Sequence, residues 1–170
     1  DYTPWPLHAS ETMPMDFEGK AEEHLSFIST HVIPFCESEY GLASSAEKRV
    51  IGGYSLGGLF SLYAAVNTDL FGTVLSCSSS LWYPGFLDYL KEHPFKAVHP
   101  NLYMSVGDQE GTTATNLTAD QTLNTLALKD WIEPKFQAGD FQFTLEEGNH
   151  GNDIPGRAWR AVEWVEENSK

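Results

Sequence analysis

Positive charge is scarce in this sequence. Its 170 residues include 10 lysines and arginines against 24 aspartates and glutamates, which gives a formal net charge of -14. Proteins that bind nucleic acids or anionic membrane surfaces need lysine and arginine to neutralise phosphate, so the composition disfavours both partners. The acidic residues form no block of like charge and are interpreted as solvated helix faces.

Long apolar runs, cysteines and metal-binding patterns are also scarce. No run of about 18 apolar residues occurs, so no membrane-spanning segment is predicted. The two cysteines, Cys36 and Cys77, favour two buried free thiols over a disulfide. The six histidines lack HExxH or comparable spacing, so we expect no metal and no other cofactor. No signal-peptide pattern is visible, which slightly favours the cytoplasm and leaves the cellular location open.

The residues that are present fit a single globular domain over residues 1–170. Hydrophobic residues make up 41% of the chain and aromatic residues 13%, which argues against disorder. Residues 1–15 are rich in proline and lack periodicity, so they predict a loop. Asp16 is expected to cap a helix that Pro34 kinks or ends, with a shorter piece continuing to Tyr40.

Strand and helix patterns alternate along the rest of the chain. Strands are predicted over residues 49–55, 72–79, 101–107 and 141–148, and helices over residues 56–67, 86–93, 117–136 and 154–168. The closing helix carries Ala158, Val162 and Val165 on its expected apolar face. This alternation predicts the α/β class, with a mostly parallel sheet covered by helices on both faces.

A glycine-rich turn surrounds one serine. Gly53, Ser55 and Gly57 form the pattern G-x-S-x-G within VIGGYSLGGLFSLYAA. In a nucleophile elbow the serine occupies a strained strand-to-helix turn, and glycines are needed because the two elements approach too closely for a Cβ. The backbone N–H of Leu56 would then face a developing oxyanion. Ordinary tight turns show the same pattern by chance, but the flanking strand and helix favour a catalytic Ser55.

A base and an acid are expected on later loops, because this architecture orders its residues as serine, acid and histidine after successive strands. His150 directly follows the last predicted strand and is the candidate base, in preference to His93 and His99, which flank an earlier loop. Asp108 and Glu110 both follow the third predicted strand, residues 101–107. The usual spacing of strand, glycine, two residues and acid favours Glu110, with Asp108 as the alternative.

Six stretches carry a family resemblance: DYTPWP, HVIPFCESEYG, RVIGGYSLGGLFSLYA, SSSLWY, SVGDQEG and GNHGND. They run from residue 1 to about residue 153. On these stretches the chain resembles the esterase D-type "putative esterase" family of the α/β-hydrolase fold, in the branch that includes siderophore-ester hydrolases. The resemblance implies a serine carboxylesterase with a small-molecule ester substrate. Some members of that branch act with a poorly placed acid, closer to a Ser–His pair, which leaves the role of Glu110 open.

The sequence departs from that family at its start. In such enzymes several strands precede the DYTP-like segment, so the resemblance implies a C-terminal portion of the fold that lacks its N-terminal strands. The missing part would hold the loop that supplies the second oxyanion N–H. An exposed sheet edge would favour a homo-oligomer or association with the missing N-terminal half. Trp5, Trp82 and Tyr83 are candidates for the substrate pocket, although such rings more often pack in a core or rim.

Three functions stay open on this basis. The first is ester hydrolysis through an acyl-enzyme formed on Ser55, with His150 as the general base. The second is an acyltransferase that passes the acyl group of the same intermediate to an alcohol or a sugar. The third is a truncated, non-catalytic binding relative, which the missing strands favour and the retained serine, histidine and acid oppose.

Overall fold

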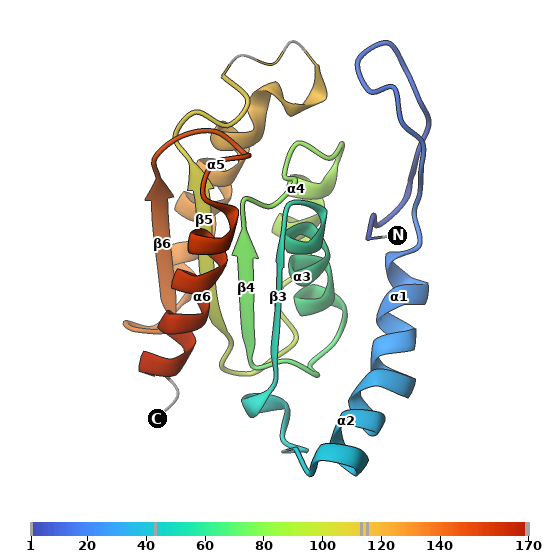
Figure 1. Cartoon of the computed structure of the whole chain (residues 1–170), viewed down its shortest axis with the longest axis vertical. Helices are drawn as coiled ribbons and strands as arrows, with labels where there is room; N and C mark the ends of the chain where they lie inside the picture. The colour runs from blue at the N-terminus through green and yellow to red at the C-terminus, as the bar shows by residue number, and fades with distance from the viewer. Residues whose placement is uncertain (1, 43, 113, 115, 169–170) are drawn as a thin grey trace.

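The computed structural model describes residues 2–42, 44–112, 114 and 116–168 (Figure 1). Asp1, the first residue of the DYTPWP stretch, lies outside the described residues. A four-stranded parallel sheet in the order β3-β4-β5-β6 forms the centre of the fold. Its strands lie within one or two residues of the predicted ranges: Val50–Tyr54 (β3), Thr73–Cys77 (β4), Asn101–Gly107 (β5) and Phe141–Glu146 (β6).

Helices cover both faces of the sheet, which confirms the predicted α/β class. The helices packed in the larger core are α1 (Ala21–Phe27), α2 (Ile33–Tyr40), α3 (Leu56–Asn67), α4 (Phe86–Glu92) and α5 (Gln121–Ile132). Helix α6 (Ile154–Asn168) packs on the opposite face in a smaller core.

Residues along each strand alternate between the two cores. On β5, Leu102 and Met104 are buried in the larger core, whereas Tyr103 packs in the smaller core with Ala161 and Trp164 of α6. Because the four strands are parallel, their carboxyl ends meet at one edge of the sheet, at the top of Figure 1. The loops that leave this edge carry the predicted site residues.

The opening segment has more structure than the predicted loop. Strands β1 (Pro6–Leu7) and β2 (Phe17–Glu18) pair antiparallel. The first helix begins at Ala21, whose N–H donates to the Thr3 carbonyl (3.0 Å). Asp16 does not cap this helix, because its carboxylate accepts a backbone hydrogen bond within the opening segment instead. The proline content predicted irregular structure correctly for most of the segment but could not reveal its pairing.

Pro34 marks a change of helix type. Helix α1 is followed by a π-helical segment, η1 (Ile28–Val32), and α2 then begins at Ile33 with Pro34 in its first turn. Proline has no N–H, and its ring collides with the carbonyl four residues earlier in an α-helix. The wider π turn accommodates this defect, so the chain stays helical up to Tyr40.

The long helix predicted over residues 117–136 is divided into three shorter helical segments. Residues 117–136 divide into a 3₁₀ turn η3 (Leu117–Asp120), α5, and a second 3₁₀ turn η4 (Glu133–Lys135) that contains Pro134. A further 3₁₀ turn, η2 (Ala46–Lys48), precedes β3. The predicted single helix was therefore too long at both ends, and the proline accounts for the second end.

The apolar face predicted for α6 is confirmed at Val165 and wrong at Ala158 and Val162. Ala158 is exposed and Val162 is 41% exposed, whereas Arg157 and Ala161 are buried and Val165 is partly buried. The helix is thus rotated by about one residue from the prediction, because the stripe that faces the sheet begins with a charged side chain. That side chain belongs to the site described below.

Cys36 and Cys77 are both free thiols, as predicted. Cys77 is also buried as predicted, whereas Cys36 is partly exposed. Burial raises the pKa of the Cys77 thiol to about 11, so this thiol stays protonated at neutral pH. No helix in the described part of the chain combines the length and the apolar character needed to cross a membrane.

Candidate active site

Ser55 occupies a strained turn between β3 and α3. Its backbone has φ 60° and ψ -121°, a conformation that costs a non-glycine residue about 1–3 kcal/mol. The Ser55 N–H donates to the Cys77 carbonyl (3.0 Å), and the Ser80 N–H donates to the Ser55 carbonyl (3.1 Å). These bonds hold the turn against β4 and the loop after it, so Ser55 is fixed at the carboxyl edge of the sheet.

The glycines around Ser55 have unequal roles. A Cβ on Gly53 would overlap the backbone of Gly57, and a Cβ on Gly58 would overlap the Ser79 hydroxyl. A Cβ on Gly57 would meet no described atom within 4 Å beyond its chain neighbours and the nearby backbone of its own helix. The steric requirement predicted for both glycines of G-x-S-x-G therefore holds for Gly53 and not for Gly57.

This difference gives a matched pair of substitutions. Gly53→Ala is expected to destabilise the fold by at least about 1–3 kcal/mol, because the new methyl group meets backbone that cannot move aside. Gly57→Ala adds the same methyl group in open space and is expected to stay within about 0.5 kcal/mol of the parent. Urea unfolding measures both free energies, and equal losses would contradict the proposed close approach of β3 and α3.

Ser55, His150 and Glu110 form a continuous chain of hydrogen-bonding side chains. His150 Nε2 lies 3.0 Å from Ser55 Oγ, and His150 Nδ1 lies 2.7 Å from Glu110 Oε2. The His150 side chain is 45% exposed, whereas the Glu110 side chain is fully buried. The structure therefore brings together three predicted residues that follow three different strands, with the serine and the imidazole accessible.

The Glu110 carboxylate is held from several sides. Its Oε1 accepts hydrogen bonds from the Ser78 hydroxyl (2.7 Å), the Gly107 N–H (2.7 Å) and the Arg157 guanidinium (2.8 Å). Burial, the largest effect, acts to raise the pKa of Glu110, but hydrogen bonds from His150, Ser78 and the Gly107 N–H hold that pKa below its ordinary value. The carboxylate thus stays ionised at neutral pH despite its burial.

Asp108, the alternative acid, has a different neighbour. It is exposed, and its carboxylate accepts a hydrogen bond from the Gly148 N–H (2.8 Å). Among the described residues, Asp108 and His150 share no hydrogen bond. Asp108 therefore joins the loop after β5 to the loop after β6, without contacting the imidazole.

Sequence reasoning missed three polar residues at this site: Tyr54, Ser78 and Arg157. The Arg157 side chain is 1% exposed and forms an ion pair with Glu110. The Tyr54 hydroxyl donates to the His150 carbonyl (2.7 Å). Burial is the main cause of a raised pKa at Tyr54, so this hydroxyl remains a donor. All three lie at the carboxyl edge of the sheet or reach it from α6.

The aromatic pocket candidates mostly serve packing. Tyr83 is 1% exposed, and its hydroxyl donates to the Trp5 carbonyl (2.6 Å). The Trp5 indole N–H donates to the Pro84 carbonyl (3.1 Å), which ties the opening segment to the loop before α4. Trp82 is partly buried with its ring 6.2 Å from that of Phe17, and it lines a cavity of about 220 Å³. Tyr83 lines the same cavity, whereas Trp5 does not.

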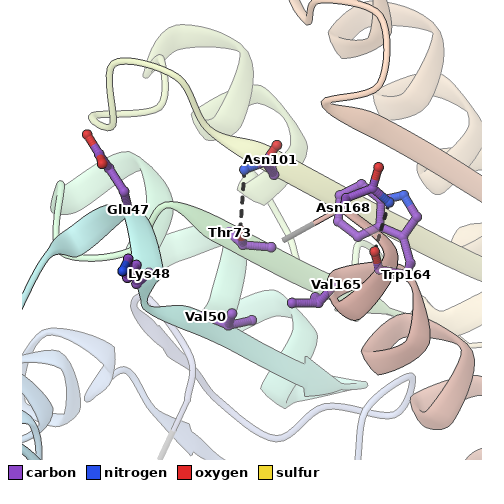
Figure 2. A pocket seen from close by; sticks show the side chains of 8 residues that line it. All are labelled: Glu47, Lys48, Val50, Thr73, Asn101, Trp164, Val165 and Asn168. Atoms are coloured by element: carbon purple, nitrogen blue, oxygen red, sulfur yellow. Dashed lines mark hydrogen bonds between the residues drawn. The ribbon is translucent and has the colours of Figure 1, made fainter. Parts of the chain in front are cut away.

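A larger cavity lies at the other end of the sheet. Figure 2 shows this cavity of about 520 Å³, whose lining includes the first residues of three strands and the end of α6: Glu47, Lys48, Val50, Thr73, Asn101, Trp164, Val165 and Asn168. It opens at the amino edge of the sheet, opposite to Ser55.

In the described part of the chain, no group of three or more His, Cys, Asp or Glu side chains is placed to hold a metal ion.

Residues 1–137 match the family model Esterase, described as "Putative esterase". The chain belongs to the Putative esterase family. The matched range includes Ser55 and Glu110 and ends before His150, whose place beside Ser55 comes from the geometry given above.

Other proteins resemble this chain in sequence or in fold. The uncharacterized protein YbbA of Bacillus subtilis (strain 168) is 27% identical over 169 residues, which cover 97% of this chain and 68% of YbbA. The siderophore hydrolase EstA from Aspergillus nidulans is 21% identical with a TM-score of 0.80, over 100% of this chain and 66% of EstA. The enterobactin esterase FES from Shigella flexneri is 20% identical with a TM-score of 0.69, over 86% of this chain and 39% of FES.

At these identities the solved structures show a shared fold of the α/β-hydrolase type. This member of the Putative esterase family spans about two thirds of the length of YbbA and of EstA, and less of FES.

Proposed function

We propose that the protein is a serine carboxylesterase with Ser55 as nucleophile and His150 as general base. The observation that carries the proposal is the 3.0 Å approach of His150 Nε2 to Ser55 Oγ, with the other ring nitrogen 2.7 Å from Glu110. A serine hydroxyl is a weak nucleophile until an adjacent base can take its proton. Membership of the Putative esterase family supports an ester as the substrate.

The proposed reaction has two halves. His150 Nε2 takes the hydroxyl proton as Ser55 Oγ attacks the ester carbonyl carbon, and Glu110 stabilises the imidazolium. The Leu56 N–H, first in α3 and without an acceptor inside the helix, donates to the oxyanion. His150 then gives the proton to the leaving alkoxide as the C–O bond breaks. His150 next takes a proton from a water molecule as the water oxygen attacks the acyl carbon. It returns that proton to Ser55 Oγ as the Oγ–C bond breaks and the acid leaves.

The substrate class that we propose is a small-molecule carboxylic ester. Siderophore esters are the first to test, because similar folds belong to a siderophore hydrolase and an enterobactin esterase. The experiment follows p-nitrophenyl ester cleavage by the intact protein, with and without a competing alcohol. An esterase gives mainly free acid, whereas an acyltransferase gives more transesterified product than acid. Failure to turn over any ester would contradict the proposal and favour a non-catalytic binding protein.

Glu110, and not Asp108, is proposed as the acid. Glu110→Gln is expected to lower kcat by about 10²–10³-fold with little change in KM, because an amide cannot stabilise the imidazolium. Asp108→Asn is the matched carboxylate-to-amide control. It is expected to change kcat by less than about threefold, because Asp108 contacts the Gly148 N–H and not the imidazole.

These two variants need comparison at equal folded fraction, measured by thermal melting. Glu110→Gln leaves the buried Arg157 without its counter-charge, and breaking a buried pair in this way costs about 3–5 kcal/mol. If Asp108→Asn is the damaging change at equal folded fraction, the acid is wrongly assigned. If neither change lowers kcat, the protein acts through a Ser55–His150 pair.

A further inference from the structure

Arg157 is a buried cation that the proposed reaction does not use directly. It lies near the start of α6, on the face that packs against the sheet, and its side chain is 1% exposed. A guanidinium group is costly to bury unless its charge and its N–H groups are all satisfied. Its partners therefore indicate what its burial achieves.

This guanidinium joins the carboxyl ends of all four strands. Its Nη1 donates to Tyr54 OH at the end of β3 (3.2 Å), to Ser78 Oγ after β4 (3.1 Å) and to Glu110 Oε1 after β5 (2.8 Å). Its Nη2 donates to the carbonyls of Glu147 (3.1 Å) and Asn149 (3.2 Å) after β6. One planar group thus links the four segments from which the site is built.

These contacts restrict both the acid and the base. Because Arg157 occupies Oε1 of Glu110, the other carboxylate oxygen faces His150 Nδ1 at 2.7 Å. The Asn149 carbonyl, which also contacts Arg157, immediately precedes His150 in the chain. Tyr54, bonded to the same guanidinium, donates to the His150 carbonyl (2.7 Å). The side chain of the acid and the backbone of the base are therefore held by one residue.

The space for the guanidinium depends on a glycine. A Cβ on Gly107 would lie 2.8 Å from Arg157 Nη2 and would overlap the Gly148 carbonyl. The last residue of β5 must therefore lack a side chain for Arg157 to reach Glu110 and the loop after β6. A specific space for this cation is part of the fold.

We propose that Arg157 is a positioning residue that holds the Glu110 carboxylate and the His150 loop in the geometry required for catalysis. The inference rests on the proposed function. With a neutral imidazole, the charge of Arg157 balances that of the buried Glu110 carboxylate at 2.8 Å, and the carboxylate faces the imidazole that becomes an imidazolium in the next step. Arg157 acts through Glu110 and His150.

The first experiment compares two arginines of α6 in the intact protein. Arg157→Met is expected to lower kcat for a p-nitrophenyl ester by about 10–100-fold with KM changed less than about threefold, because positioning of the acid and base affects the transition state. Arg157→Lys keeps the charge but cannot span both sets of acceptors, so an intermediate loss is expected. Arg160→Met is the control: Arg160 is 40% exposed and pairs with Glu146 and Asp153, so kcat should change less than about threefold.

A double variant separates positioning from simple stability. Glu110→Gln/Arg157→Met removes both buried charges, so it folds more readily than either single variant. If Arg157 acts through both Glu110 and the His150 loop, adding Arg157→Met to Glu110→Gln lowers kcat by a smaller factor than Arg157→Met does alone. Multiplying losses in the double variant would overturn the inference.

A purely structural role would lower the melting temperature and leave kcat per folded molecule unchanged. That result in Arg157→Met, or in Arg157→Lys if the methionine variant does not fold, also overturns the inference. Failure of the proposed function has a different signature, because the parent protein would then turn over no ester, or its activity would persist in Ser55→Ala. Activity that depends on Ser55 but is indifferent to Arg157 contradicts this inference alone.

Discussion

Replacing Ser55 by alanine is expected to abolish ester hydrolysis and covalent labelling by a fluorophosphonate probe. The reason is geometric: the turn presents Ser55 Oγ 3.0 Å from His150 Nε2, and alanine keeps the turn but removes the oxygen that we propose as the nucleophile. The loss in kcat should reach at least about 10³-fold and as much as 10⁶-fold, as in serine hydrolases that lose their nucleophile. Steady-state kinetics and intact-protein mass spectrometry measure the two effects.

The neighbouring Ser80 supplies a matched control for the labelling experiment. The Ser80 hydroxyl lies 3.4 Å from Ser55 Oγ. The imidazole of His150 forms its hydrogen bond with Ser55 Oγ. Ser80→Ala should therefore keep the probe adduct, which peptide mapping should place on Ser55. Equal labelling of Ser55→Ala and the parent protein would show that the nucleophile is another residue and would remove the basis of the proposed function.

The parallel sheet explains why the main site residues could be predicted from the sequence. Carboxyl ends of parallel strands meet at one edge, so residues that follow β3, β5 and β6 must lie near one another. Ser55 was predicted from the glycine pattern between a strand and a helix. His150 was predicted from its position after the last strand. The spacing after β5 favoured Glu110 over Asp108, and the structure places Glu110 against the imidazole.

Arg157 could not be predicted in this way, because an arginine in a polar helix is ordinarily solvent-exposed. Spacing alone does not distinguish the stripe that contains Ala158 and Val162 from the stripe that contains Arg157 and Ala161 one position earlier. The structure buries the second stripe. The decisive partner, Glu110, lies 47 positions away in the chain, and nothing local to α6 indicates it.

The docking of the opening segment was hidden for a similar reason. Its composition predicted irregular structure, but composition does not state what a segment packs against. The Trp5 indole finds its acceptor, the Pro84 carbonyl, 79 positions later. Long-range partners of this kind also explain why Tyr83, a pocket candidate in the sequence, is a core residue in the structure.

Replacing His150 by alanine is expected to lower kcat by about a thousandfold or more, because no other group then takes the Ser55 proton. The residual rate would come from substrate binding and the oxyanion site. His93→Ala is the matched control. His93 Nδ1 lies 2.8 Å from the Tyr89 carbonyl at the end of α4, so its loss should leave kcat within about threefold of the parent.

The same imidazole sets the expected pH dependence of catalysis. Base catalysis needs a neutral imidazole, so kcat/KM should fall as the pH is lowered from neutral. Hydrogen bonds hold the pKa of Glu110 below its ordinary value despite burial, so Glu110 stays ionised over the pH range measured and the fall should follow a single proton. Esterase rates measured between about pH 5 and pH 8 test this expectation. A fall that follows two protons would contradict the ionised acid, and a damaging His93→Ala variant would move the base away from His150.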